Sequence, residues 1–306
     1  PYDRNISAFE STKLLICWIS LYGAGYFLRP SERLAHLLTA SLVVMAVLIP
    51  FVMATDPLSP DQALRWRFQG QVASYAWFAN AIAFTAIFAL ALETTVVLRV
   101  VVVVLGALAL AYTGARAELF GYMFVVMVWL AASSQRRYIL PAAAALLMFF
   151  IVALFVVGYF HPQLLTRYTN IGSSASLNER WQIMIGGIKD IMANPIFGDY
   201  GGYIRSQKDF GSYIHNALSM WHQFGIVPFI LYILMTTGCL IAAVRRRIAG
   251  RDFDARWWSL LLVSAFCCLL IVVAKSVFWP LPALAWGLQS QLSKDREQRS
   301  HKDNYG

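Results

Sequence analysis

Long runs of apolar residues, separated by short polar segments, dominate the chain. A helix needs ~20 apolar residues to cross the hydrocarbon core of a bilayer, and eight runs approach that length. They lie near 14–28, 34–54, 72–92, 95–112, 118–133, 139–160, 217–243 and 257–278, and a ninth, shorter and marked by prolines, covers about 279–292. Such unbroken blocks are not the alternating pattern of a membrane barrel. The pattern predicts an all-α, polytopic helical membrane protein with about nine spans.

The first segment, PYDRNISAFESTK, has neither the basic start nor the small-residue cleavage site of a signal peptide. We therefore expect the nine spans to belong to a larger bundle with further spans upstream. Composition agrees with a membrane protein, since hydrophobic residues make up 59% and charged residues only 13%, against about 25% charged in soluble proteins. The formal charge of +9 fits anionic lipid and pyrophosphate partners and does not imply nucleic acid.

Lysine and arginine in the short loops predict the orientation of the spans. The basic loops fall on one side, which we expect to be cytoplasmic: 29–33, 133–137, 244–256 and 294–303. The other side receives 55–70, 113–118 and the long segment 161–214. That long segment breaks the pattern because it carries five cations on the side that should be poor in them, which indicates a functional reason: Arg167, Arg180, Lys189, Arg205 and Lys208.

This orientation divides the chain into four segments. We expect N-terminal transmembrane helices with short periplasmic loops over 1–160, and a large, partly helical periplasmic loop over 161–216. C-terminal transmembrane helices should cover 217–292, and a cytoplasmic tail should cover 293–306.

The periplasmic loop contains a predicted amphipathic helix. Ser176 and Glu179 have the spacing of a capping box, so the helix should run from Leu177 to about Ala193 and stop at Asn194-Pro195. Its apolar residues share one face: Trp181, Met184, Ile185, Ile188, Ile191 and Met192. Such a helix is expected to lie along the membrane surface. Arg180 and Lys189 lie on opposite edges of that face, so Arg180 can turn either to lipid headgroups or to a site beside the helix.

Two further polar stretches have competing interpretations. In SYIHNALSMWHQFG, His215 and Asn216 precede an apolar run, and from the residues alone they are better explained as a helix cap formed with Ser212. A metal site with His222 is not favoured, because seven helical residues separate the two rings by roughly 10 Å. In RDFDAR, arginines flank both carboxylates of a D-x-D spacing, which favours local salt bridges over a metal site.

The segment NERWQIMIGGIKDIMANPIFGDYGGY, followed by HNALSMWHQFGIVPF, resembles the O-antigen ligase and polymerase superfamily. In that family an arginine helix, a P-x-x-G turn with further glycines, and an H-N pair before a helix with a late glycine recur in this order. TGARAELFGY (113–122) and RFQG (67–70) resemble two further family elements, so the resemblance covers about 65–290. Gln223 is a departure, since many relatives carry an acidic residue there.

The resemblance implies glycosyl transfer at the outer face of the bacterial inner membrane, with no cofactor and no metal. The donor would be an undecaprenyl-pyrophosphate-linked glycan, the acceptor the lipid A-core oligosaccharide, and membrane lipids would surround the site. His215 matches the expected base, since imidazole titrates near neutral pH. Arg180 and Arg116 match family arginines suited to a pyrophosphate. Further substrate-binding candidates are Arg67, Arg65, Asn216 and Lys189.

Related activities differ from this one mainly in the acceptor. An O-antigen or exopolysaccharide polymerase and a protein O-glycosyltransferase share the same motifs, whereas a transporter of lipid-linked glycans would place ionisable groups near the bilayer midplane. A polymerase must hold two lipid-linked substrates, and its relatives often have two large outer loops that carry arginines. This chain has one large outer loop, 161–214, and one short one, 55–70, so we favour the ligase.

Overall fold

The computed structural model describes residues 2–55, 65–68, 71–133, 175–202 and 214–305, with scattered positions between 144 and 159. The chain forms two compact units, which are described separately. Unit 1 combines Pro1–Arg29 with Ser174–Gly306, and unit 2 is Pro30–Ser173. The four segments predicted from the sequence are defined by their side of the membrane and remain predictions.

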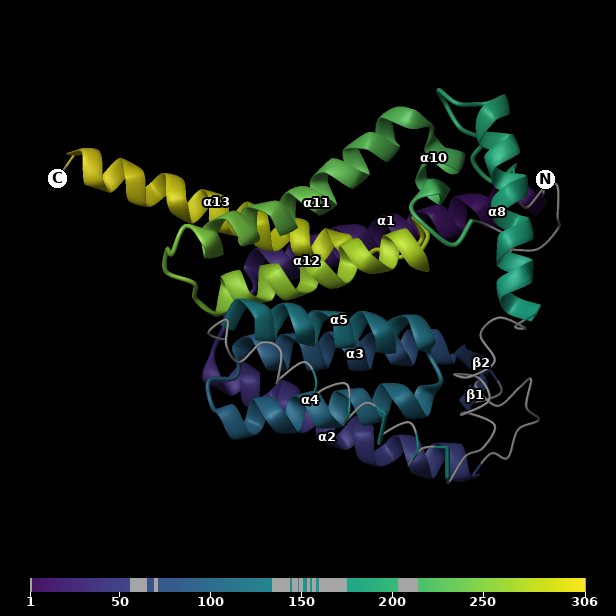
Figure 1. Cartoon of the computed structure of the whole chain (residues 1–306). Coiled ribbons are helices and arrows are strands. Elements are labelled where there is room, and N and C mark those ends of the chain that lie inside the picture. Colours follow the sequence, from purple (N-terminus) through teal and green to yellow (C-terminus); the bar gives the residue numbers. More distant parts are fainter. Residues whose placement is uncertain are drawn as a thin grey trace. The chain divides into compact units, whose positions relative to one another are not determined.

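Four helices make up most of the described part of unit 2. They are α2 (Glu32–Thr55), α3 (Tyr75–Leu92), α4 (Val96–Thr113) and α5 (Arg116–Ser133). Connections of two or three residues, 93–95 and 114–115, make successive helices antiparallel neighbours. In Figure 1 these four helices lie side by side. α3 and α4 contact each other, and each of them also contacts both α2 and α5.

Small residues and internal hydrogen bonds hold unit 2 together. A Cβ on Gly106 would lie 2.7 Å from the Tyr122 hydroxyl, so this glycine lets α4 and α5 approach closely. The same hydroxyl donates to the Val102 carbonyl at 3.1 Å. At the α3–α4 connection the buried Glu93 accepts a 2.9 Å hydrogen bond from Thr39 of α2, which satisfies a carboxylate that would otherwise be costly to bury.

Unit 1 contains six helices among the described residues. They are α1 (Tyr2–Phe27), α8 (Ala175–Ala193), α10 (Leu218–Phe224), α11 (Ile226–Ile248), α12 (Ala255–Val273) and α13 (Pro282–Tyr305). α1 packs along α13, although the two are at opposite ends of the sequence, and α12 contacts both α11 and α13. Figure 1 shows α8 running crosswise to α1 and α12, at the end of unit 1 where α10 lies.

Close helix packing in unit 1 depends on two glycines. A Cβ on Gly25 of α1 would overlap the Leu284 carbonyl of α13, and one on Gly287 of α13 would overlap the Tyr22 carbonyl of α1. The backbones therefore approach as closely as in small-residue membrane interfaces. Beside this contact the rings of Trp18 and Trp286 lie tilted to each other with centroids 4.9 Å apart, and the buried Tyr232 of α11 makes T-shaped contacts with both.

Five helices among the described residues are long and apolar enough to cross a membrane. The candidate spans are Glu32–Ile49, Val96–Thr113, Arg116–Ser133, Ile226–Ile248 and Ala255–Val273, and Phe78–Leu92 is a shorter apolar helix. Large apolar side chains on α11, such as Val227 at 59% and Leu234 at 61%, are exposed, which suits a helix surrounded by lipid. The polytopic helical class is thus confirmed. The predicted span 139–160 falls largely outside the described residues.

Three details differ from the sequence prediction. The predicted span 217–243 is divided, because Gly225 has φ +87 and separates α10 from α11. A short antiparallel hairpin, β1 (Arg65–Phe68) and β2 (Gln71–Ser74), precedes α3 and was not expected in an all-α fold. The amphipathic helix ends at Ala193 as predicted but begins at Ala175, so Ser176 lies in its first turn and not at its cap.

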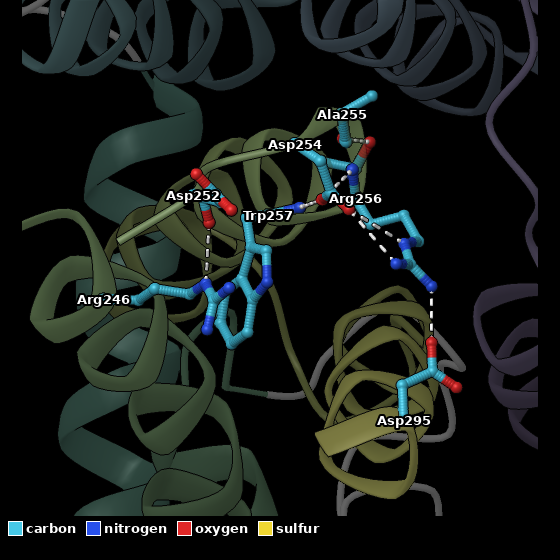
Figure 2. Close-up of polar contacts among 8 residues, drawn as sticks. Arg246, Asp252, Asp254, Ala255, Arg256, Trp257 and Asp295 are labelled. Atoms are coloured by element: carbon cyan, nitrogen blue, oxygen red, sulfur yellow. Dashed lines mark hydrogen bonds and ion pairs between the residues drawn. The ribbon is translucent and has the colours of Figure 1, made fainter. Parts of the chain in front are cut away.

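The D-x-D stretch of the α11–α12 loop has a structural role (Figure 2). Asp254 caps α12 by accepting from the Arg256 and Trp257 amides, and its carboxylate lies 3.1 Å from the Arg256 guanidinium. Arg256 also reaches Asp295 of α13, while Arg246 donates to the Asp252 carbonyl at 2.9 Å. The salt-bridge interpretation is therefore confirmed for Asp254, while Arg256 links α12 to α13 and Arg246 links α11 to the loop.

Candidate functional site

One face of α8 packs against the segment that carries His215. At 100° per residue, helical geometry places Arg180, Met184, Gly187 and Ile191 on one side of the helix. Ile191 is 4% exposed, and a Cβ on Gly187 would overlap the Ile214 side chain. Met184 accepts from the Asn216 amide at 3.7 Å through its sulfur. Arg180 is one turn before Met184, so it extends the face that meets 214–216.

His215 lies between two residues that contact α8. Ile214 is 2% exposed and packs at Gly187, while Asn216 contacts Met184. His215 itself is half-buried. The structure therefore brings the backbone of His215 to the face of α8 that begins at Arg180.

Asn216 also organises the start of α10. Its side-chain Oδ1 accepts from the Leu218 amide at 2.9 Å, and its carbonyl accepts from the Ser219 amide at 3.0 Å. The N-cap position of α10 is Ala217, so Asn216 lies one residue before the cap and satisfies the amide of the first helical residue from there; Ser212 lies outside the described residues. With Nδ2 donating to Met184, this side chain holds both α8 and α10, and its expected role in substrate binding stays a prediction.

The segment 194–202 after α8, which we call the glycine turn, crosses the backbone at the end of α10. Gly198 has φ +70, and a Cβ there would lie 2.6 Å from the Gly225 nitrogen. A Cβ on Gly225 would in turn overlap the Ile196 carbonyl. The Asp199 amide donates to the His222 carbonyl at 2.7 Å, and the Ile226 amide donates to the Pro195 carbonyl at 3.2 Å. These glycines serve a close backbone crossing, which the sequence alone did not reveal.

A chain of side-chain contacts reinforces this crossing. Gln223, 1% exposed, accepts from the Gly201 amide at 2.9 Å, and its Nε2 lies 2.8 Å from Nδ1 of His222. His222 is 3% exposed, and its Nε2 lies 3.5 Å from the Asp190 carboxylate on α8. Sequence reasoning did not assign His222, Gln223 or Asp190 to the site. The sequence offered one signal for the first two: His222 and Gln223 are adjacent polar residues inside the predicted apolar span 217–243.

Lys189 does not share the Arg180 face. Nine residues of helix turn it by about 180° from Arg180, and its side chain is exposed. Between the two positions runs a stripe of exposed apolar side chains: Trp181 at 57%, Ile185 at 38%, Ile188 at 42% and Met192 at 73%. The predicted apolar face is therefore split, with Met184 and Ile191 directed to the protein and the other four exposed.

An apolar cavity of about 440 Å³ lies beside α10 within unit 1. Met220 and Phe224 of α10 line it together with Tyr200 of the glycine turn. Trp18 of α1 and Trp286 of α13 close another part of its wall. The cavity thus adjoins the same turn that carries the backbone crossing, and its chemistry suits a hydrocarbon chain.

The remaining candidate residues belong to unit 2. Arg116 is half-buried and is the first residue of α5, two residues after the Gly114 cap of α4 with φ 65. Glu118, in the same first turn, is 3% exposed. The first amides of a helix create positive potential, so Arg116 adds its charge at a position already suited to an anion. Arg65 and Arg67 lie in β1, in register with Ser74 and Val72 of β2.

The fold and the site together define a polytopic helical membrane protein that carries cations and a histidine at the ends of its spans. Residues 101–233 match the family model described as O-Antigen ligase. This part of the chain is thus similar to the O-antigen ligase family, which agrees with the resemblance noted in the sequence. No curated protein matched the chain. The matched region contains Arg116, Arg180 and His215 and ends within α11, whereas Arg65 and Arg67 precede it.

Proposed function

We propose that the protein is an O-antigen ligase of the bacterial inner membrane with its active site facing the periplasm. It would move a glycan from undecaprenyl pyrophosphate onto the lipid A-core oligosaccharide. One observation carries the proposal. Within the region that matches the ligase family, the two neighbours of His215, Ile214 and Asn216, contact α8 at Gly187 and Met184, on the side of the helix where Arg180 also lies.

In the proposed reaction, a hydroxyl oxygen of the acceptor attacks the anomeric carbon of the glycan. The bond between that carbon and the pyrophosphate oxygen breaks, and undecaprenyl pyrophosphate leaves with the bonding electrons. His215 accepts the hydroxyl proton, which is the general-base role of a neutral imidazole. The position of His215 between two residues anchored on α8 supports this role, because a base must be held within reach of its proton.

Arg180 and Arg116 are the groups proposed to stabilise the leaving pyrophosphate. A guanidinium keeps its charge at any physiological pH and can bind two phosphate oxygens at once. Arg180 extends the face of α8 that meets 214–216, and Arg116 lies at the positive end of α5. Arg65 and Arg67 of the hairpin are proposed to contact the diphosphate or headgroups, and no metal has a role in this scheme.

The lipid part of the donor would have an apolar environment beside this site. The cavity lined by Met220, Phe224 and Tyr200 adjoins the glycine turn. It therefore offers a hydrocarbon chain a place next to the backbone crossing that positions α8, which supports a lipid-linked donor.

Comparison of a deletion strain with its parent tests the choice of acceptor. Loss of a ligase should leave long polymer on the carrier and bare core on lipid A when lipopolysaccharide is resolved on a gel. Complementation with the intact gene should restore the ladder. Cores bearing a single repeat in the deletion strain would instead identify a polymerase and overturn the ligase proposal.

A further inference from the structure

The buried pair His222-Gln223 forms a directional hydrogen-bond chain. The Gly201 nitrogen can only donate, so the atom of Gln223 that it contacts at 2.9 Å must be the amide oxygen. The amide nitrogen then faces Nδ1 of His222 at 2.8 Å. Because Gln223 donates there, Nδ1 must be an acceptor. A neutral ring with an unprotonated Nδ1 carries its proton on Nε2, and that atom faces the Asp190 carboxylate at 3.5 Å.

We propose that His222, as the neutral Nε2–H tautomer, is a positioning residue that fixes α8 relative to the segment carrying His215. Hydrogen bonds join Gly201, Gln223 and His222, and Nε2 of His222 lies 3.5 Å from the Asp190 carboxylate, so these contacts link the glycine turn, α10 and α8. This proposal rests on the proposed function, since it assigns His222 the task of holding Arg180 and His215 in register.

The geometry supports a positioning role over a direct catalytic one. His222 is 3% exposed, and its carbonyl also accepts from the Asp199 amide at 2.7 Å, so backbone and side chain both engage neighbouring elements. Asp190 lies ten residues after Arg180 on the same helix, so a shift at Asp190 is transmitted along a rigid rod of about 15 Å. The contact of Met184 with Asn216 lies between these two points.

Replacing Gln223 by Glu should change which nitrogens of the His222 ring carry a proton. A carboxylate can still accept from the Gly201 amide, but its second oxygen has no proton to give to Nδ1. His222 must then donate through Nδ1, and with Asp190 at its other nitrogen it should be held doubly protonated. Gln223→Leu removes both contacts and leaves the ring without its partner.

The test that does not depend on activity measures the ring nitrogens of His222. Nitrogen-15 NMR of the full chain labelled at histidine in lipid nanodiscs can resolve five histidines, and a His222→Phe sample assigns the signal. At neutral pH we expect Nδ1 unprotonated and Nε2 protonated in the native protein, and both protonated in Gln223→Glu. A native Nδ1–H tautomer, or an unchanged signal in Gln223→Glu, would overturn the proposal.

Transfer kinetics test the functional half of the proposal. His222→Phe keeps the ring volume but makes no polar contact, whereas His222→Asn keeps an acceptor for Gln223. We expect His222→Phe to lower kcat by roughly 10- to 100-fold with KM for the donor little changed, and His222→Asn to recover most of that loss. His36→Phe, on the exposed surface of α2, is the control. A native value of kcat in His222→Phe would refute the positioning role. Absence of transfer by the native protein would instead refute the proposed function, and the NMR measurement would still test the tautomer.

Discussion

At the scale of single residues, His215 is the side chain on which the proposed chemistry depends. Its replacement by Ala should lower transfer by ~10²–10⁴-fold, the usual effect of losing a general base. The measurement is the initial rate of glycan transfer by purified protein, with folding verified by size-exclusion chromatography. His36→Ala, on an exposed position of α2, should retain full activity. A folded His215→Ala variant with near-normal turnover would exclude the base role.

Arg180 allows charge and geometry to be separated. Arg180→Lys keeps the positive charge but loses the planar two-point contact with phosphate oxygens, so we expect an activity well below the native level in a folded protein. Gln182→Ala is the control, because it truncates an exposed polar side chain on the opposite side of the same helix and should retain native activity. Equal activity of Arg180→Lys and the native protein would argue against a bidentate pyrophosphate contact.

At the scale of elements, the crossing of the glycine turn over the end of α10 determines how the site is assembled. Three Gly→Ala substitutions should separate backbone strain from crowding. Gly198→Ala suffers both φ +70 and a 2.6 Å contact with the Gly225 nitrogen, and Gly201→Ala suffers only φ +72. Gly186→Ala in α8 meets no atom within 4 Å.

Thermal unfolding in detergent should rank the three variants. The left-handed backbone alone costs about 1–2 kcal/mol for a residue other than glycine, so Gly201→Ala should be moderately destabilised. Gly198→Ala should be the least stable, because overlap adds to that cost. Gly186→Ala should be as stable as the native protein or more so, since Ala is favoured over Gly within a helix by roughly 0.5–1 kcal/mol. A Gly198→Ala variant as stable as Gly186→Ala would contradict the crossing.

Local features of the sequence predicted most of these elements, but not how they meet. Helical periodicity and Asn194-Pro195 located α8 and its end, because both signals act over a few residues. The break at Gly225 was missed, since one glycine within an apolar run leaves hydropathy unchanged. The contact of Gly198 with Gly225 joins positions distant in sequence, and no local pattern encodes it. For the same reason the sequence did not predict the contacts of His222 and Gln223, whose partners Asp190 and Gly201 are distant in sequence.

At the scale of the whole molecule, the positive-inside pattern predicts which ends of the spans face the periplasm. A cysteine at Phe197, which is 86% exposed in the glycine turn, should react with a membrane-impermeant thiol reagent added to intact spheroplasts. A cysteine at Arg251, exposed in the α11–α12 loop, should react only after lysis. Both would be introduced into a chain whose four native cysteines are replaced. The reverse pattern would invert the proposed orientation and remove the site from the periplasm.

The central claim is that this chain forms a glycosidic bond and does not merely move a lipid-linked glycan across the bilayer. The most direct measurement reconstitutes the purified protein in liposomes with undecaprenyl-pyrophosphate-linked glycan and lipid A-core oligosaccharide, and then analyses the products by mass spectrometry. Our account predicts that lipid A-core gains the glycan while undecaprenyl pyrophosphate is released, and that His215→Ala abolishes both products. Donor that crosses the bilayer with its pyrophosphate bond intact, with no glycan on the acceptor, would contradict it.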